Sequence, residues 1–354
     1  MLKKGGNIDL ARPTIRDVAK KAGYSVTAVS LVLNQKEARI SDVAKEKILA
    51  VAKEMNYRQN RLAVDMIRKK TMVLGLIIPD NSNMFFAELS RSIESAASQA
   101  EYNVIYGNTN NNPHKDYEYI CMFSDRQVDG IIFARSARIS KEEEEKLLKL
   151  IEDTNIPFVW VDREINGTDN KSGCVVLDHE LGGYLAGEHL TKLGHTRIGC
   201  FTGPAGLENS NKRLLGFKRA MEHAGLTYGD DMLFEGDYQT GKGDEALEFF
   251  INRKVSAVFA FNDLMAIDLY RSAHKMNIKI PEDLSIVGFD NIPFSDLILP
   301  PLTTINQPVR EMGKSVVETM LEIIEKKDQD KTEYRKVFEP KLIVRGSTIE
   351  AGVK

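Results

Sequence analysis

The chain has 354 residues, of which 42% are hydrophobic and 28% charged. This composition excludes collagen-like and wholly disordered chains, and the length favours two or three domains. The net charge of −3 hides an asymmetry, because residues 1–71 contain 16 basic and 7 acidic side chains whereas the remainder contains 32 and 44. A basic segment joined to an acidic body predicts an anionic partner for that segment, although a solvated basic tail would give the same charge.

Cysteine usage and hydropathy indicate the compartment. Cys121, Cys174 and Cys200 lie far apart and form no CxxC pair. This predicts a reducing, cytoplasmic location without a disulfide framework or a structural zinc site. No apolar run approaches the ~18 residues of a membrane span, and the first residues lack the apolar core of a secretory signal, so we expect no membrane partner.

The basic segment predicts three short helices. The first covers residues 14–21 and ends at Gly23, and its apolar face consists of Ile15, Val18, Ala19 and Ala22. The second begins after Ser25, with Val29, Val32 and Leu33 facing inward. The third runs from Ser41 to Met55, with an apolar set of Val43, Ile48, Val51, Ala52 and Met55. Three such helices with a glycine in the first turn predict a helix-turn-helix unit, whose second helix enters the major groove of DNA.

From Met72 onward, short apolar runs alternate with amphipathic helices. We expect strands at 72–78, 103–106, 129–133, 157–161, 174–177, 197–201, 257–261 and 285–289. Continuous apolar runs are typical of parallel strands that are covered on both faces. Two such series predict two doubly wound lobes. We assign about 72–163 and 291–325 to the first lobe, and about 164–290 and 326–350 to the second.

Several specific motifs are shared with one known family. The chain carries TIRDVAKKAGYSVTAVSLVLN (14–34), NYRQN (56–60), GHTRIGCFTGP (194–204), FNDLMA (261–266), IVGFDN (286–291) and PPLTTINQP (300–308). Together they resemble the LacI/GalR family of bacterial transcription regulators over nearly the whole chain. The resemblance implies an α + α/β protein, with a helix-turn-helix domain and a two-lobed body like periplasmic binding proteins. It implies a disordered extension (1–11), a DNA-binding domain (12–59), a hinge helix or linker (60–71) and an effector-binding and dimerisation body (72–350).

The resemblance also assigns DNA contacts. Val26, Thr27 and Leu31 take the base-reading positions, although Val26 could instead be a core residue. Many family members carry arginine where this chain has Leu31, and leucine cannot make a bidentate contact to guanine. Met66 takes the place of a leucine that wedges into the minor groove, unless residues 60–71 are a plain linker. The full expected set is Thr14, Arg16, Ser25, Val26, Thr27, Ala28, Ser30, Leu31, Asn34, Tyr57, Asn60, Ala63 and Met66.

The body contains no GxSxG, HExxH or phosphate-loop motif, so we expect no enzyme activity, cofactor or metal. Ligands of open α/β sheets bind at the carboxyl ends of strands, which here places an effector between the lobes. By resemblance to ribose-binding proteins of this fold, the effector residues are Asn83, Phe85, Phe86, Asp162, Arg163, Arg213, Tyr238, Asn262, Asp290 and Gln307. Aromatic rings, carboxylates, arginines and amides suit a small polyol.

Other roles remain possible for some of these residues. Phe85 or Phe86 could be core residues, Asp290 could be a turn residue, and Asp263 is expected to cap the helix that follows it. We expect Trp160, which lies two residues before Asp162, to report on the cleft.

These features predict a homodimeric repressor of a sugar-utilisation operon. A palindromic operator would be released when ribose or a similar monosaccharide binds between the lobes. Two alternatives stay open: a global catabolite regulator controlled by a phosphorylated carrier protein as coregulator, and a regulator with a purine corepressor.

Overall fold

The computed structural model describes residues 13–34, 40–57, 70–137, 139–163, 172–325 and 334–352. The chain divides into two compact units, with the boundary between Thr71 and Met72 in the sequence, and each unit has its own hydrophobic core. The predicted extension (1–11) lies outside the described residues. The same is true of the predicted hinge (60–71), except for its last two residues.

The first unit is a bundle of three helices, α1 (Ile15–Ala22), α2 (Val26–Leu33) and α3 (Asp42–Glu54). Side-chain oxygens of Thr14, Ser25 and Ser41 cap their N-termini, which explains why each helix starts where it does. The core consists of Val18, Ala19, Ala22, Val29, Val32, Ile48 and Ala52. The prediction that Val43 belongs to this core is wrong, since Val43 is 75% exposed and Ala44 is buried in its place.

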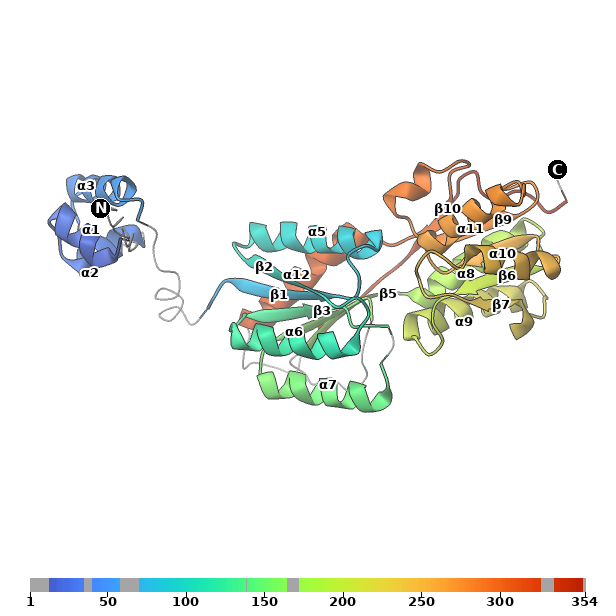
Figure 1. Ribbon diagram of the computed structural model, residues 1–354, viewed down its shortest axis with the longest axis horizontal. Helices are drawn as coiled ribbons and strands as arrows, with labels where there is room; N and C mark the ends of the chain where they lie inside the picture. Colours follow the sequence, from blue (N-terminus) through green and yellow to red (C-terminus); the bar gives the residue numbers. More distant parts are fainter. Residues whose placement is uncertain are drawn as a thin grey trace, which may run out of the picture. The chain divides into compact units, whose positions relative to one another are not determined.

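The second unit contains two six-stranded sheets (Figure 1). The first sheet is wholly parallel, in the order β11-β5-β4-β3-β1-β2. Its strands are β1 (Val73–Ile78), β2 (Asn103–Asn108), β3 (Gly130–Phe133), β4 (Phe158–Val161), β5 (Ser172–Leu177) and β11 (Tyr334–Phe338). Helices α5 (Met84–Gln99) and α12 (Val309–Glu325) cover one face, and α6 (Pro113–Asp125) and α7 (Lys141–Thr154) cover the other.

The second sheet has the order β12-β10-β9-β8-β6-β7, and only the β10–β12 pair is antiparallel. Its strands are β6 (Ile198–Thr202), β7 (Leu233–Glu235), β8 (Ala257–Ala260), β9 (Ser285–Asp290), β10 (Thr303–Asn306) and β12 (Lys341–Ile343). The pair α8 (His179–Lys192) and α9 (Glu208–His223) packs on one face, and α10 (Gly243–Asn252) and α11 (Asp263–Lys275) form the second pair. Two short 3₁₀ helices, η1 (Asp230–Met232) and η2 (Pro293–Asp296), lie in connections.

The chain passes between the two sheets three times, after β5, after β10 and after β11. The predicted lobe boundaries are therefore wrong. Strands β5 and β11 belong to the first lobe, and the stretch 291–306 with β10 belongs to the second. The run at 174–177 resembles the opening strand of a new series because an apolar strand carries no local signal of the sheet in which it pairs.

The prediction for Trp160 is also wrong. Its ring is fully buried under α6 and α7, 5.2 Å from the ring of Phe133, and it does not line the cleft. Successive residues of a strand point to opposite faces, and Trp160 points away from the face that holds α5 and α12.

Candidate DNA-binding and effector sites

On the three-helix unit, called the head below, the N-terminal residues of α2 and the residues that cap α1 and α2 are exposed. Val26 is 42% exposed, which removes its alternative role as a core residue. Thr27 and Arg16 are exposed, and Leu31 is half-buried. A helix of this kind, with its N-terminal side chains free of the core, can present them to base edges in a major groove.

Several of the other predicted DNA contacts already take part in local hydrogen bonds. The Ser25 hydroxyl oxygen accepts from the Ala28 amide at 3.1 Å, which leaves its O–H group available to donate to a phosphate. The Asn34 amide donates to the Ser30 carbonyl at 2.7 Å and stiffens the end of α2. Thr14 caps α1 and Tyr57 packs against the core of the head, whereas Asn60, Ala63 and Met66 lie outside the described residues.

In the body, the ends of strands from both sheets meet at one small cavity of about 30 Å³. All ten predicted effector residues line this cavity, together with one that sequence reasoning missed. The full lining is Asn83, Phe85, Phe86, Asp162, Arg163, Asn209, Arg213, Tyr238, Asn262, Asp290 and Gln307. A monosaccharide needs more room than this, so we expect the side chains that line the cavity to rearrange when one enters.

The first lobe contributes an ion pair and two aromatic rings. Arg163 Nε lies 3.3 Å from Oδ2 of Asp162, without the angle of a hydrogen bond, and Arg163 Nη1 donates to the Arg135 carbonyl at 2.7 Å. Burial raises the pKa of Asp162, while Arg163 and Arg213 act in the opposite direction. The centroid of the Phe86 ring lies 5.8 Å from the Arg163 guanidinium, and the side chains of both Arg163 and Asp162 are buried.

The second lobe holds Arg213 from several sides. Its Nη1 donates to the Phe261 carbonyl, its guanidinium stacks 3.6 Å from the centroid of Phe289, and Nη2 lies 3.9 Å from Oδ1 of Asp290. Tyr238 lies 5.6 Å away on another side. A guanidinium fixed in this way presents donors in one orientation, as recognition of hydroxyl or carboxylate oxygens requires.

Asp290 and Gln307 line one side of the cavity, which is called its floor below. Asp290 is buried and has φ of +115°, a backbone conformation that non-glycine residues seldom adopt. Gln307 Nε2 donates to Asp290 Oδ1 at 2.6 Å, while Gln307 Oε1 has no hydrogen-bond partner. Burial raises the pKa of Asp290 well above its usual range, against the opposing effect of Arg213. A strained acid beside an unsatisfied amide oxygen is an arrangement expected where a polar ligand binds.

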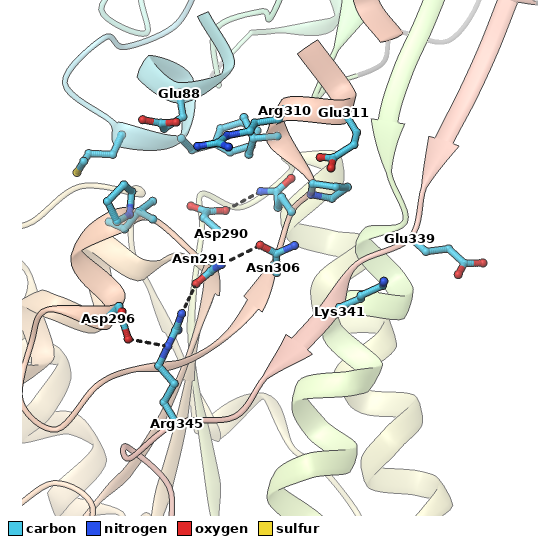
Figure 2. A pocket seen from close by; sticks show the side chains of 17 residues that line it. Glu88, Asp290, Asn291, Asp296, Asn306, Arg310, Glu311, Glu339, Lys341 and Arg345 are labelled. Atoms are coloured by element: carbon cyan, nitrogen blue, oxygen red, sulfur yellow. Dashed lines mark hydrogen bonds and ion pairs between the residues drawn. The ribbon is translucent and has the colours of Figure 1, made fainter. Parts of the chain in front are cut away.

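A larger cavity of about 580 Å³ adjoins this floor and shares Phe85, Asp290 and Gln307 with it (Figure 2). Its wall is a hydrogen-bonded chain, in which Asn291 Nδ2 donates to Asn306 at 2.8 Å and Arg345 Nη2 donates to Asn291 Oδ1 at 2.8 Å. Arg345 also lies 3.3 Å from Asp296. This wall ties the ends of β9 and β10 to the segment that follows β12.

The prediction that Asp263 caps α11 is wrong, because Asn262 is the cap and accepts from the Met265 amide at 2.9 Å. Asp263 instead accepts from Thr304 Oγ1 at 2.6 Å and Ser295 Oγ at 2.5 Å, and so binds the loop after β9 to the sheet. Asn262 Nδ2 also donates to the Tyr238 carbonyl at 3.0 Å. Asn262 thus shapes the cavity through hydrogen bonds that are already satisfied.

Comparison with known proteins identifies the family. Residues 14–60 match the model of bacterial regulatory proteins of the lacI family, and residues 188–348 match that of the periplasmic binding protein-like domain. The chain is 36% identical to the transcriptional regulator DegA of Bacillus subtilis over 95% of this chain and 98% of that protein. The chain belongs to the LacI family. The resemblance found in the sequence, the fold class and the DNA-binding regulatory function are thereby confirmed.

Two further relatives bear on the effector. The transcriptional repressor PurR of Aliivibrio salmonicida is 35% identical over 94% of this chain and 98% of that protein. A LacI-family regulator from Enterococcus faecium, solved with bound ribose, is 32% identical with a TM-score of 0.70, covering 78% of this chain and 99% of that one. These relatives are regulators of transcription and not enzymes, as expected for this chain.

Two negative findings apply to the part of the chain that the structure describes. There, no group of three or more His, Cys, Asp or Glu side chains could hold a metal ion. Over the same residues, no helix is both long and apolar enough to cross a membrane.

Proposed function

We propose that this LacI-family regulator represses a sugar-utilisation operon in the cytoplasm and leaves its operator when a small sugar binds between the lobes. The proposal depends on one observation above all: the ten predicted side chains, from seven separate segments of the chain, line a single cavity. Two phenylalanine rings can stack on the apolar face of a sugar ring, and two arginines, two carboxylates and several amides can hydrogen bond its hydroxyls.

Ribose or a similar aldose is the proposed effector. The relative from Enterococcus faecium with bound ribose supports this choice, because it is similar to this chain throughout the body. The inner cavity is lined by charged and amide groups in fixed positions, which suits a compact ring with hydroxyls on every side. Isothermal titration with D-ribose, D-xylose, L-arabinose and D-glucose tests the proposal, and no heat of binding with any of them would refute it.

A purine corepressor is the second candidate, and it is suggested by several relatives, similar over 94% of this chain, that are transcriptional repressors named PurR. The same titration with hypoxanthine and guanine separates the two. A purine that strengthens operator binding would replace the sugar proposal, whereas a sugar that weakens operator binding would support it. A phosphorylated carrier protein becomes the remaining candidate coregulator if neither class binds.

We also propose a homodimer, since two helix-turn-helix heads are needed to read a palindromic operator. An apolar patch on the second lobe supports this proposal. Phe294, Leu297 and Leu299 are 50%, 70% and 86% exposed and follow one another around η2. An exposed patch of large apolar side chains is characteristic of a protein–protein contact.

A further inference from the structure

His179 lies where the chain first passes from one lobe to the other. It is the first residue of α8, two residues after the end of β5, and only 3% of it is exposed. It does not line the effector cavity. Neither the DNA-binding role nor the effector role considered so far uses this buried imidazole.

The imidazole contacts charged effector residues of both lobes. Its Nδ1 lies 3.4 Å from both Nε and Nη2 of Arg213, and its Nε2 lies 4.0 Å from Oδ1 of Asp162. Arginine carries only hydrogen-bond donors, so Nδ1 must be the unprotonated nitrogen that accepts. A neutral ring then carries its proton on Nε2, which faces the Asp162 carboxylate.

Close backbone packing fixes this arrangement. A Cβ atom at Gly183 on α8 would overlap the carbonyl group of Arg213, and a Cβ atom at Gly216 on α9 would overlap the carbonyl group of Glu180. The two glycines therefore let α8 and α9 approach more closely than other residues would allow. Arg213 and His179 are held beside each other by the helices that carry them, and not only by their own contact.

The surroundings of His179 favour the neutral ring. Burial lowers its pKa well below the usual value, and the nearby Arg213 lowers it further. Lys212 and Arg163 also lower the pKa of His179, whereas a hydrogen bond with the Asp162 backbone acts in the opposite direction. A charged imidazole could not accept from Arg213, because both ring nitrogens would then be donors.

We propose that His179 is a positioning residue of the effector site, acting as an Nε2–H tautomer whose Nδ1 accepts from the Arg213 guanidinium and so orients it. Arg213 Nη1 is held by the Phe261 carbonyl, but the Nε edge depends on His179. Without that acceptor the guanidinium can rotate about its Phe261 contact. The effect on effector binding depends on the proposed function, whereas the tautomer and its dependence on Arg213 do not.

Long-range ¹H–¹⁵N correlation spectra of the imidazole rings in the full-length protein at pH 7 test the tautomer directly. The His179 ring is assigned as the signal that disappears in His179→Asn. We expect the neutral Nε2–H pattern in the wild type and a loss of this tautomer preference in Arg213→Ala. An Nδ1–H or doubly protonated His179, or a pattern unchanged in Arg213→Ala, would overturn the proposal.

A matched pair of variants tests the role in binding. The amide of His179→Asn can place an oxygen near the position of Nδ1, whereas His179→Leu fills the space without an acceptor. The assay measures the sugar concentration that releases labelled operator, with D-ribose, D-xylose, L-arabinose and D-glucose. We expect His179→Asn to need nearly the same sugar concentration as the wild type. His179→Leu should need at least about tenfold more sugar, which corresponds to one weakened charge-assisted hydrogen bond.

The outcomes separate the two proposals. Release of His179→Leu at wild-type sugar concentrations would refute the positioning role alone. Equal losses in both variants, accompanied by equal losses of thermal stability, would also refute it, because they would indicate a purely structural residue. Release of Arg213→Ala at wild-type concentrations would refute the effector site itself. If none of the four sugars acts on the wild type, the sugar proposal fails while the spectra still decide the tautomer.

Discussion

Replacement of Arg213 by alanine should remove the response to effector and leave operator binding intact. Arg213 is 3% exposed, and its guanidinium stacks on Phe289, donates to the Phe261 carbonyl and has Nη2 3.9 Å from Asp290, which also lines the cavity. Each charge-assisted hydrogen bond to a sugar oxygen contributes about 1.5–3 kcal/mol. One or two such bonds correspond to a loss of roughly tenfold to 10⁴-fold in effector affinity.

The assay is fluorescence anisotropy of a labelled palindromic operator, selected by the protein from a random library and titrated with each sugar. Arg219→Ala is the matched control, because Arg219 lies on the same helix but its side chain is 54% exposed and pairs with Glu180 at the surface. Arg213→Lys should be impaired too, since lysine keeps the charge without the planar fork of donors. If Arg213→Ala leaves the operator at wild-type sugar concentrations, the assignment of this cavity is wrong.

Four further predictions concern other parts of the molecule. Gln239→Ala removes the 2.7 Å hydrogen bond from Gln239 Nε2 to Asp80, which joins the two lobes. Its loss should weaken sugar binding by up to about tenfold in calorimetry. An unchanged Kd would mean that this hydrogen bond does not stabilise the closed arrangement of the lobes. Burial raises the pKa of Asp116 to about 6, so the free energy of unfolding should fall as the pH rises from about 4 to 6, by at most ~3 kcal/mol. Urea unfolding of Asp116→Asn should not show this pH dependence. If the free energies of unfolding of the variant and the wild type differ by the same amount at every pH, Asp116 is not the group responsible. Leu299→Lys should shift the sedimentation of the protein toward a monomer, and an undisturbed dimer would place the interface elsewhere. Leu31→Arg should favour operators with an added guanine by about 1–3 kcal/mol in a competition assay, and no change in base preference would remove position 31 from the reading surface.

Sequence patterns predicted the three helices of the first unit and eight strands of the second because local signals define these elements. Ser25 and Ser41 mark helix starts through their side-chain oxygens, and alternation of Leu74, Leu76 and Ile78 with Ile77 reflects a strand buried on both faces. Lobe membership was predicted poorly. The stretch 174–177 pairs with β4 and β11 of the first sheet, and pairing partners distant in sequence leave no trace in the strand itself.

Prediction of the candidate site likewise succeeded where local sequence determines the position of a residue and failed where distant packing does. Residues that come directly after strands, such as Asp162 and Asn262, could be placed because parallel strands end at one edge of a sheet. Asn209 and His179 were missed, since their position depends on how α9 packs against α8. Trp160 was assigned to the cleft from its nearness to Asp162, although the face of the strand, and not its distance along the chain, decides where a side chain points.

The central claim is that effector and operator compete through one conformational equilibrium of the body. The most direct test is calorimetric titration of the full-length protein with D-ribose, D-xylose, L-arabinose and D-glucose, with and without a saturating palindromic operator. Calorimetry is preferable to tryptophan fluorescence because Trp160 is buried away from the cavity. We expect one sugar to bind with a Kd that operator raises by a factor of roughly 5–150, the usual range of allosteric coupling. A sugar affinity that is the same with and without operator would contradict this account.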